Sequence, residues 1–177
     1  TMTISQASDR VVIDWTTFNI GAPNTVNFVQ PSNSSIAFNR VPGAVLSSIN
    51  GQLSGNGGVF IFSNGGITVG STGRIDTGSL VLATGLPDPS DYTTMLSTNT
   101  VMMRAPATLT PLDPFPAVTI QAGAEIETTA GPVWLVAPTM TMDGQITTNR
   151  TVTEIVSEGA QTFYTTGAGG LFEQLPS

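Results

Sequence analysis

The chain has 177 residues, with five arginines, twelve carboxylates and no lysine, histidine or cysteine, which gives a net charge of −7 at pH 7. This acidic balance argues against nucleic acid or an anionic membrane surface as the partner, because both require a basic surface. Without cysteine the chain has no disulfides and no thiolate ligands for structural zinc or iron–sulfur clusters.

The length fits a single domain with a substantial core, and only 10% of the residues are charged, so Thr, Ser, Asn and Gln must supply most of the polar surface. No apolar run approaches the roughly 18 residues of a membrane helix. We therefore expect one monomeric domain over residues 1–177 that does not insert into a membrane. Because Thr1 is followed by neither a basic nor a long apolar segment, we expect any export signal to have been removed or left out.

Short strands are predicted from the first residues onward. Residues 3–6, 11–18 and 25–30 each give a strand, and apolar and polar side chains alternate in the second and third. Trp15 shares one face of the second strand with Val11, which predicts a core position.

The secondary structure of residues 36–53 is only partly determined by the sequence pattern. Residues 36–41 form another strand. Residues 44–53 show helical spacing of their apolar side chains, which indicates the single helical turn of the chain, although a strand is nearly as good an interpretation.

The stretch from Gly57 to Thr84 shows the organisation most clearly. Phe60 and Phe62 fall on one face of their strand, which we expect to face the core. Three strand-like segments alternate with corners rich in Gly, Ser and Asn: residues 59–62, 67–69 and 80–82.

The same order of strands and corners returns 51 residues later. This offset places Arg74 on Glu125, and a shift of two more residues places Leu80 on Val133. The sequence therefore contains a diverged internal repeat.

Residues 85–116 interrupt the repeat and carry six of the twelve prolines. Proline cannot donate to a strand ladder, so this segment should leave the main body as an extra-helical excursion, with short edge strands at 100–104 and 107–110. After the second copy a third turn follows over residues 140–165, and residues 167–177 form a loose end.

Repeated coils of three short strands predict an all-β fold, a right-handed parallel β-helix. The competing architecture is an antiparallel sandwich. Hairpin signals are few, with Asn-Gly at Asn50-Gly51 and Asn64-Gly65 among them, so the β-helix is favoured. Its open first coil requires a cap, for which the strands at 11–18 and 25–30 are candidates.

Two alternative functions have separate signatures. A polysaccharide-acting enzyme needs carboxylates that converge on one site. Glu125 and Glu127 share a strand face, and the repeat stacks Asp76 near Glu127. These three residues are better interpreted as solvated carboxylates on the surface. We therefore expect no enzyme, no catalytic residue, no cofactor and no metal ligand. A carbohydrate-binding or adhesive module would expose aromatic side chains, for which the candidates are Phe60, Phe62, Trp134, Phe163 and Tyr164.

Seven stretches occur in a characteristic order: residues 9–21, 24–28, 35–41, 49–53, 57–62, 66–70 and 76–84. Together they resemble the N-terminal secretion domain (TPS, or haemagglutination activity, domain) of filamentous-haemagglutinin-type proteins, the exoproteins of two-partner secretion. Two corners differ from the family pattern. Ser63-Asn64-Gly65-Gly66 stands where the family usually has Asn-Pro-Asn-Gly, and Gln30-Pro31-Ser32-Asn33 stands where some members have Asn-Pro-Asn-Leu.

The resemblance implies a β-helix with an N-terminal antiparallel cap and extra-helical strands. The domain would be exported through the periplasm of a Gram-negative bacterium and be secreted or attached to the cell surface. Its role would be targeting and folding nucleation, at the start of a large adhesin, haemolysin or contact-dependent toxin. The implied partner is an outer-membrane barrel transporter with POTRA domains.

The resemblance also implies two sets of site residues. Transporter recognition falls on the two corners, namely Gln30, Pro31, Ser32, Asn33, Ser63, Asn64, Gly65 and Gly66. The structural motif consists of Trp15, Phe18, Asn19, Gly21, Asn27, Phe28 and Asn39.

Overall fold

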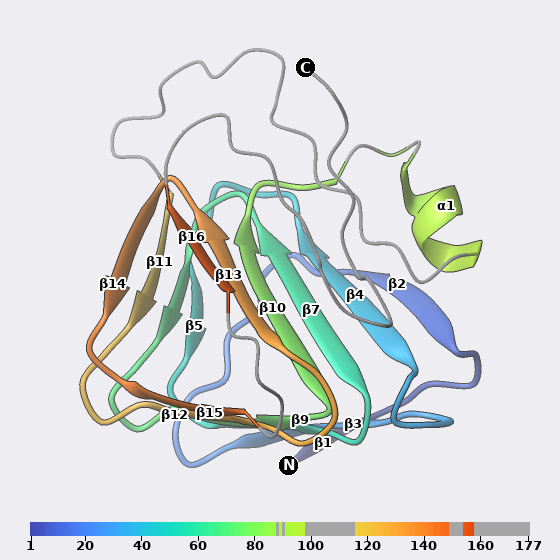
Figure 1. The fold of residues 1–177 in the computed structure, drawn as a ribbon, viewed down its shortest axis with the longest axis horizontal. Coiled ribbons are helices and arrows are strands. Elements are labelled where there is room, and N and C mark those ends of the chain that lie inside the picture. Colours follow the sequence, from blue (N-terminus) through green and yellow to red (C-terminus); the bar gives the residue numbers. More distant parts are fainter. Residues whose placement is uncertain (88, 90, 98–115, 149–153, 158–177) are drawn as a thin grey trace.

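The computed structural model describes residues 1–87, 89, 91–97, 116–148 and 154–157. Three parallel sheets form the sides of a prism (Figure 1). From β3 (Thr25–Val29) onward the chain winds around it through one strand of each sheet in turn, whereas between β2 (Arg10–Asp14) and β3 the third side holds only the isolated bridge of Ile20 to Ile49. This is the parallel β-helix that the sequence predicts. Among the described residues, every strand pair is parallel.

The sheets are numbered in the order in which the chain enters them. The first sheet contains β1 (Met2–Ser5), β3 (Thr25–Val29), β6 (Gln52–Gly55), β9 (Arg74–Thr77), β12 (Glu125–Thr128) and β15 (Gln145–Thr148). The second contains β2 (Arg10–Asp14), β4 (Ile36–Val41), β7 (Gly58–Ser63), β10 (Ser79–Thr84), β13 (Val133–Ala137) and β16 (Glu154–Ser157). The third contains β5 (Ser47–Ile49), β8 (Ile67–Val69), β11 (Ala117–Ile120) and β14 (Thr139–Met142).

The internal repeat predicted from the sequence is the register of the sheets. Arg74 pairs with Glu125 between β9 and β12, and Leu80 pairs with Val133 between β10 and β13. The offset changes from 51 to 53 residues because two extra residues enter the corner between β12 and β13. Aligning the repeat therefore gave the strand pairing correctly.

Stacked aliphatic side chains fill the inside of the prism. Along the first sheet, Leu53, Ile75 and Ile126 occupy equivalent positions of successive strands, and all three are buried. Burying one such side chain contributes about 1.5–3 kcal/mol, but only when a neighbouring coil covers it. Each coil is therefore stable only as part of the stack.

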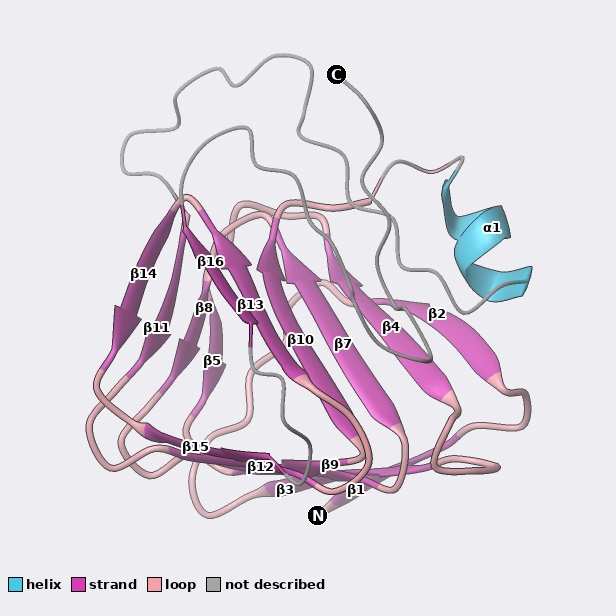
Figure 2. Cartoon of the chain, viewed as in Figure 1, coloured by secondary structure: helices cyan, strands magenta, loops and turns pink. Residues whose placement is uncertain are grey.

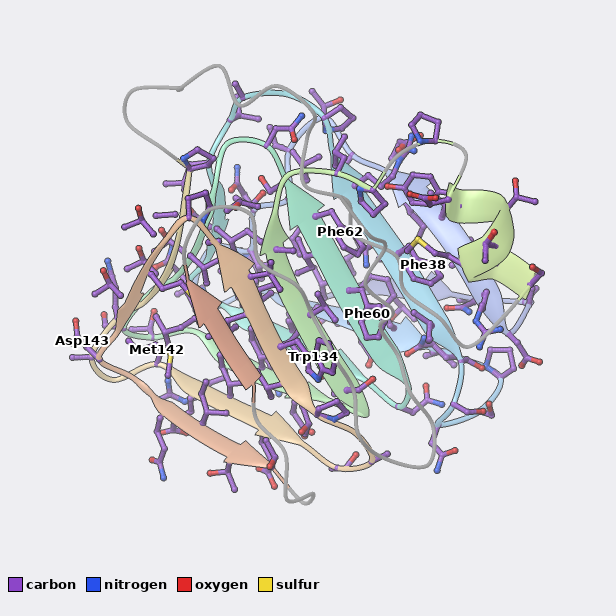
Figure 3. The ribbon with its side chains drawn as sticks, turned by 45° about the horizontal axis from the view of Figure 1, so that its top comes forward. Phe38, Phe60, Phe62, Trp134, Met142 and Asp143 are labelled. Carbon is purple, nitrogen blue, oxygen red and sulfur yellow. The ribbon has the colours of Figure 1, made fainter. Side chains whose placement is uncertain are left out.

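A second apolar cluster lies outside the prism, on the outer face of the second sheet. Phe38, Phe60, Phe62 and Trp134 belong to it (Figure 3), and none of them is more than 4% exposed. The prediction that Phe60 and Phe62 share a face is correct, but that face is not the inside of the prism. The β7 residues that alternate with Phe60 and Phe62 face the inside of the prism. Both faces of β7 are therefore buried, which explains its uninterrupted run of apolar residues.

The helix α1 (Asp91–Ser97) covers part of this outer cluster and contacts β2 (Figures 1 and 2). It lies in the proline-rich segment, after β10 ends at Thr84 and before β11 begins at Ala117. The expected edge strands at 100–104 and 107–110 lie outside the described residues, as do the end of the third turn and residues 167–177.

Two other expectations are wrong. The N-terminal strands do not form an antiparallel cap, because β1 pairs in parallel with β3 and β2 pairs in parallel with β4. Residues 44–53 contain no helical turn, because β5 and β6 occupy residues 47–49 and 52–55. Their helical spacing arises where one strand ends, the chain turns at Asn50-Gly51, and the next strand starts.

Candidate recognition surface

The two corners predicted to be recognised lie on different edges of the prism. Residues 30–33 connect β3 to β4, where the first sheet meets the second. Residues 63–66 connect β7 to β8, where the second sheet meets the third. The structure therefore does not bring the two corners together into one site.

Gln30 is a buried structural residue rather than an exposed contact. Its Nε2 donates to Oε1 of Gln6 at 3.1 Å and to the carbonyl oxygens of Ser35 and Gly58, both at 3.2 Å. Its Oε1 accepts from the backbone N–H of Gly57 at 2.9 Å. One amide thus joins three successive coils and satisfies backbone groups that would otherwise be buried unpaired.

The rest of the first corner divides into an inner and an outer part. The backbone N–H of Ser32 donates to Oγ of Ser35 at 3.0 Å, and the Ser32 hydroxyl is within 3.0 Å of the Ser34 and Ser35 hydroxyls. Pro31 and Asn33 are exposed. Of the four predicted residues, Pro31 and Asn33 are therefore the ones that a partner can reach.

The second corner is hydrogen-bonded to the preceding coil. Nδ2 of Asn64 donates to the carbonyl oxygen of Pro42 at 2.8 Å, and its backbone N–H donates to the carbonyl of Val41 at 3.1 Å. Ser63 is fully buried and accepts a 3.1 Å hydrogen bond from the Ser47 hydroxyl. The Asn64 side chain therefore holds the neighbouring 42–46 loop instead of projecting freely from the corner.

Both glycines of this corner are required by its geometry. A Cβ on Gly65 would collide with the backbone of Val45, and Gly66 has a φ of +92° and lies beneath the backbone of Ala117. A side chain at either position is disfavoured for steric reasons. The sequence pattern predicted the turn correctly, and its glycines act through the backbone.

Sequence reasoning missed the surface beside this corner. Val45 and Leu46 are 42% and 51% exposed, and they follow Pro42 in the loop that Asn64 holds. The signal in the sequence was the pair of adjacent apolar residues after Pro42-Gly43, which the helical interpretation assigned to a helix face.

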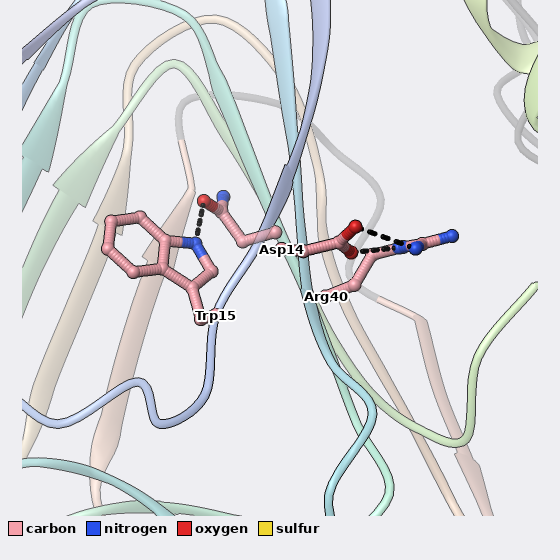
Figure 4. A network of polar contacts seen from close by, with 4 residues as sticks. Asp14, Trp15 and Arg40 are labelled. Atoms are coloured by element: carbon pink, nitrogen blue, oxygen red, sulfur yellow. Dashed lines mark hydrogen bonds and ion pairs between the residues drawn. The ribbon is translucent and has the colours of Figure 1, made fainter.

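The motif residues Trp15 and Asn39 form a contact inside the first coils. Nε1 of Trp15 donates to Oδ1 of Asn39 at 2.9 Å (Figure 4), and Asn39 is fully buried. Trp15 is half-buried against the inner core, as predicted, and its ring meets Phe18 edge-on with 5.6 Å between centroids. These residues stabilise the first turn of the prism.

The remaining motif residues are spread over the same coils. Oδ1 of Asn19 accepts from the backbone N–H of Ser48 at 2.8 Å, and Oδ1 of Asn27 accepts from the Ser54 hydroxyl at 2.9 Å. Phe28 is buried, whereas Gly21 is exposed and has open space around it.

The surface carboxylates are arranged as the repeat predicts. Asp76 and Glu127 are paired between β9 and β12 and both are exposed; Glu125 forms a 3.0 Å ion pair with Arg74. Within the described ranges there is no group of three or more acidic residues placed to bind a metal ion.

The described candidates for a carbohydrate-binding face do not expose their aromatic rings. Phe60, Phe62 and Trp134 are buried, and Phe163 and Tyr164 lie outside the described residues. No helix in the described part of the chain is long and apolar enough to cross a membrane.

Comparison with known proteins gives matches to secretion domains and to heme/hemopexin-binding proteins. The family model of the TPS secretion domain matches residues 1–169. The heme/hemopexin-binding protein of Haemophilus influenzae is 47% identical over 60 residues, which are 34% of this chain and 6% of that protein. The heme/hemopexin-binding protein of Haemophilus influenzae strain Rd is 45% identical over 60 residues, which are 34% of this chain and 7% of that protein.

A solved structure has the same fold. The crystal structure of the HMW1 secretion domain from Haemophilus influenzae matches with a TM-score of 0.67 and 24% identity, over 82% of this chain and 37% of that one. The present chain thus spans a small part of the curated relatives that it matches. On the strength of the match over residues 1–169, the chain belongs to the family of TPS secretion domains, the secretion-targeting domains of two-partner exoproteins.

Proposed function

We propose that this domain is the N-terminal targeting and folding-nucleation module of a large exported protein, and that a POTRA-bearing outer-membrane barrel transporter recognises it in the periplasm. The observation that carries the proposal is the TPS family match over residues 1–169 on a stack of parallel coils. The domain itself acts as a monomer and has no catalytic role. The exported protein is secreted or held at the cell surface as an adhesin, haemolysin or contact-dependent toxin.

Folding nucleation is supported by the last coil of the stack. Met142 occupies the position of Ile120 in the third sheet but is 37% exposed, whereas Ile120 is fully buried. In the first sheet Ile146 is half-buried, whereas its partner Ile126 is buried. In the part of the chain that the structure describes, β14, β15 and β16 are thus edge strands next to a partly uncovered apolar layer, on which a further coil can stack.

Transport is supported by the composition and the topology. The chain has few charges and no crosslinking cysteine, both of which favour passage through a narrow pore. Parallel strands paired between segments 20 to 50 residues apart are slow to form, because loop closure must precede pairing. Slow pairing of this kind favours a chain that is still unfolded during translocation.

Recognition is proposed at the accessible parts of the two corners, namely Pro31 and Asn33 at the first and the Asn64–Gly65 turn at the second. The test is a pull-down with the purified POTRA region of the cognate transporter, using the domain both unfolded and folded. Asn33→Ala should weaken capture, whereas Asn24→Ala, another exposed asparagine on a different prism edge, should not. Absence of capture in both states would overturn the proposed recognition.

A further inference from the structure

The outer aromatic cluster is a second core that the coil stack alone does not close. Phe38 and Phe60 lie on neighbouring strands with their rings edge-on, 5.7 Å between centroids, and both are fully buried although they point away from the prism. Tyr92 and Met95 of α1 pack into the same cluster. An isolated layer of this kind would expose aromatic surface if α1 were not docked.

Helix α1 depends on this docking for its structure. It has seven residues, fewer than an isolated helix needs to be stable in water. It follows β10 in the chain but contacts β2, which is the far edge of the second sheet beyond β7 and β4. The chain therefore reaches back past β7 and β4 to the first coil.

Arg40 makes a polar contact between the sheet and α1. Its guanidinium carbon lies 4.6 Å from the centroid of the Tyr92 ring, which is the geometry of a cation–π contact. The same guanidinium donates to both carboxylate oxygens of Asp14, with Nη2 to Oδ2 at 2.9 Å (Figure 4). Because Asp14 holds it through two parallel hydrogen bonds, the guanidinium is oriented before α1 arrives.

The strand register makes this arrangement conditional. Asp14 and Arg40 are direct partners in the pairing of β2 with β4, so the bidentate contact exists only when the first two coils are paired in this register. A slip of one residue would turn Arg40 to the inner face and remove the contact.

We propose that α1 is a clasp over the outer aromatic cluster and that Arg40, oriented by Asp14, is its latch. The clasp opens and closes while the coil stack stays intact, and it closes only over correctly paired N-terminal coils. Release of α1 uncovers the part of the cluster against which Tyr92 and Met95 pack. The latch thus couples the docking of α1 to the register of the first two coils.

The test is hydrogen–deuterium exchange of the whole domain, followed separately in the α1 peptide and in the β7 and β10 peptides. Arg40→Gln should speed exchange of α1 by about tenfold, because it removes the cation–π contact and the ion pair. Asp14→Asn should speed it in the same direction by a smaller factor. In both variants the β7 and β10 peptides should stay within about twofold of the parent protein.

A matched control is Arg74→Gln, which removes an ion pair of the first sheet and should leave α1 exchange unchanged. The proposal is overturned if α1 exchanges equally fast in Arg40→Gln and in the parent, if α1 and β7 accelerate together, or if α1 is unprotected in the parent. An Asp14→Asn variant without effect on α1 would overturn the orienting role of Asp14.

Discussion

Asn39 and Trp15 join through a 2.9 Å hydrogen bond from the indole Nε1 to the amide Oδ1, inside the first coils of the prism. Nδ2 of the same asparagine donates to the carbonyl oxygens of Ala37 and Phe60, at 3.1 and 3.3 Å. A single buried side chain therefore contacts three successive coils, and its geometry is satisfied only in the native register.

Replacing Asn39 by alanine should lower the free energy of unfolding by about 2–3 kcal/mol, because the part-buried Trp15 N–H and the buried Phe60 carbonyl lose their partner and a small cavity forms. Trp15→Phe should cost about 1–2 kcal/mol, since the ring contact with Phe18 is largely kept and one hydrogen bond is lost. Urea unfolding followed by circular dichroism measures both. Equal stability of Asn39→Ala and the parent would contradict this account of the contact.

Gln30→Ala should cost about 2–3 kcal/mol, because the N–H of Gly57 loses its acceptor and Oε1 of Gln6 loses its donor in a buried corner. Asn33→Ala, three residues away and exposed, should change stability by less than about 0.5 kcal/mol. The two midpoints in urea distinguish the structural from the accessible part of the first corner. If both substitutions were neutral, Gln30 would not connect the coils.

Three glycines form a graded series of substitutions to alanine. Gly21→Ala should be nearly neutral, because a Cβ there meets no atom within 4 Å. Gly85→Ala should cost about 1 kcal/mol, from its φ of +87° alone. Gly66→Ala should cost more than about 2 kcal/mol, because it adds a Cβ only 2.9 Å from the Ala117 carbonyl to the strain of φ +92°. Thermal unfolding should rank the variants in this order, and a different order would contradict the proposed packing of the corner.

Stability should fall in alkaline solution through Tyr92. Burial raises the pKa of Tyr92 to about 12 from the usual 10. The folded state keeps this proton where the unfolded state loses it, so the contribution is complete below pH 10 and is lost as the pH rises toward 12. Arg40 stays charged over this range, because its hydrogen bond to Asp14 raises its pKa.

The alkaline measurement is simple because the chain lacks lysine and cysteine, and its other tyrosine is Tyr164. Urea midpoints at pH 9 and pH 11 should differ less in Tyr92→Phe than in the parent protein. An unchanged difference would show that Tyr92 does not titrate in the buried position.

Most of the fold could be predicted because coil stacking imposes the same spacing on every turn. The offset aligned Arg74 with Glu125 and Leu80 with Val133, and both are direct partners. The direction of the first strands could not be obtained this way. Apolar and polar side chains alternate over residues 11–18, and they would do so in a parallel or an antiparallel strand. Alternation shows which residues share a face of the strand but not which strand pairs with it.

The outer cluster and α1 were missed for a related reason. An uninterrupted apolar run such as Val59–Phe62 shows that both faces of the strand are buried, but not which face is inside. The prolines around Asp91–Ser97 indicated that the chain leaves the stack. They gave no sign of the short helix there, because its stability depends on docking. At the two corners, the turn glycines could be recognised from the sequence, whereas the buried partners of Gln30 depend on distant coils.

The most direct test of the proposed function is export that depends on the partner transporter. The domain, with a signal peptide for inner-membrane export, is expressed with and without the cognate POTRA-bearing outer-membrane protein, and its amount in the culture medium is measured. We predict that folded domain accumulates in the medium only when the transporter is present, and remains in the periplasm otherwise. Equal accumulation with and without the transporter, or retention in the periplasm in both cases, would contradict the assignment as a transporter-recognised secretion domain.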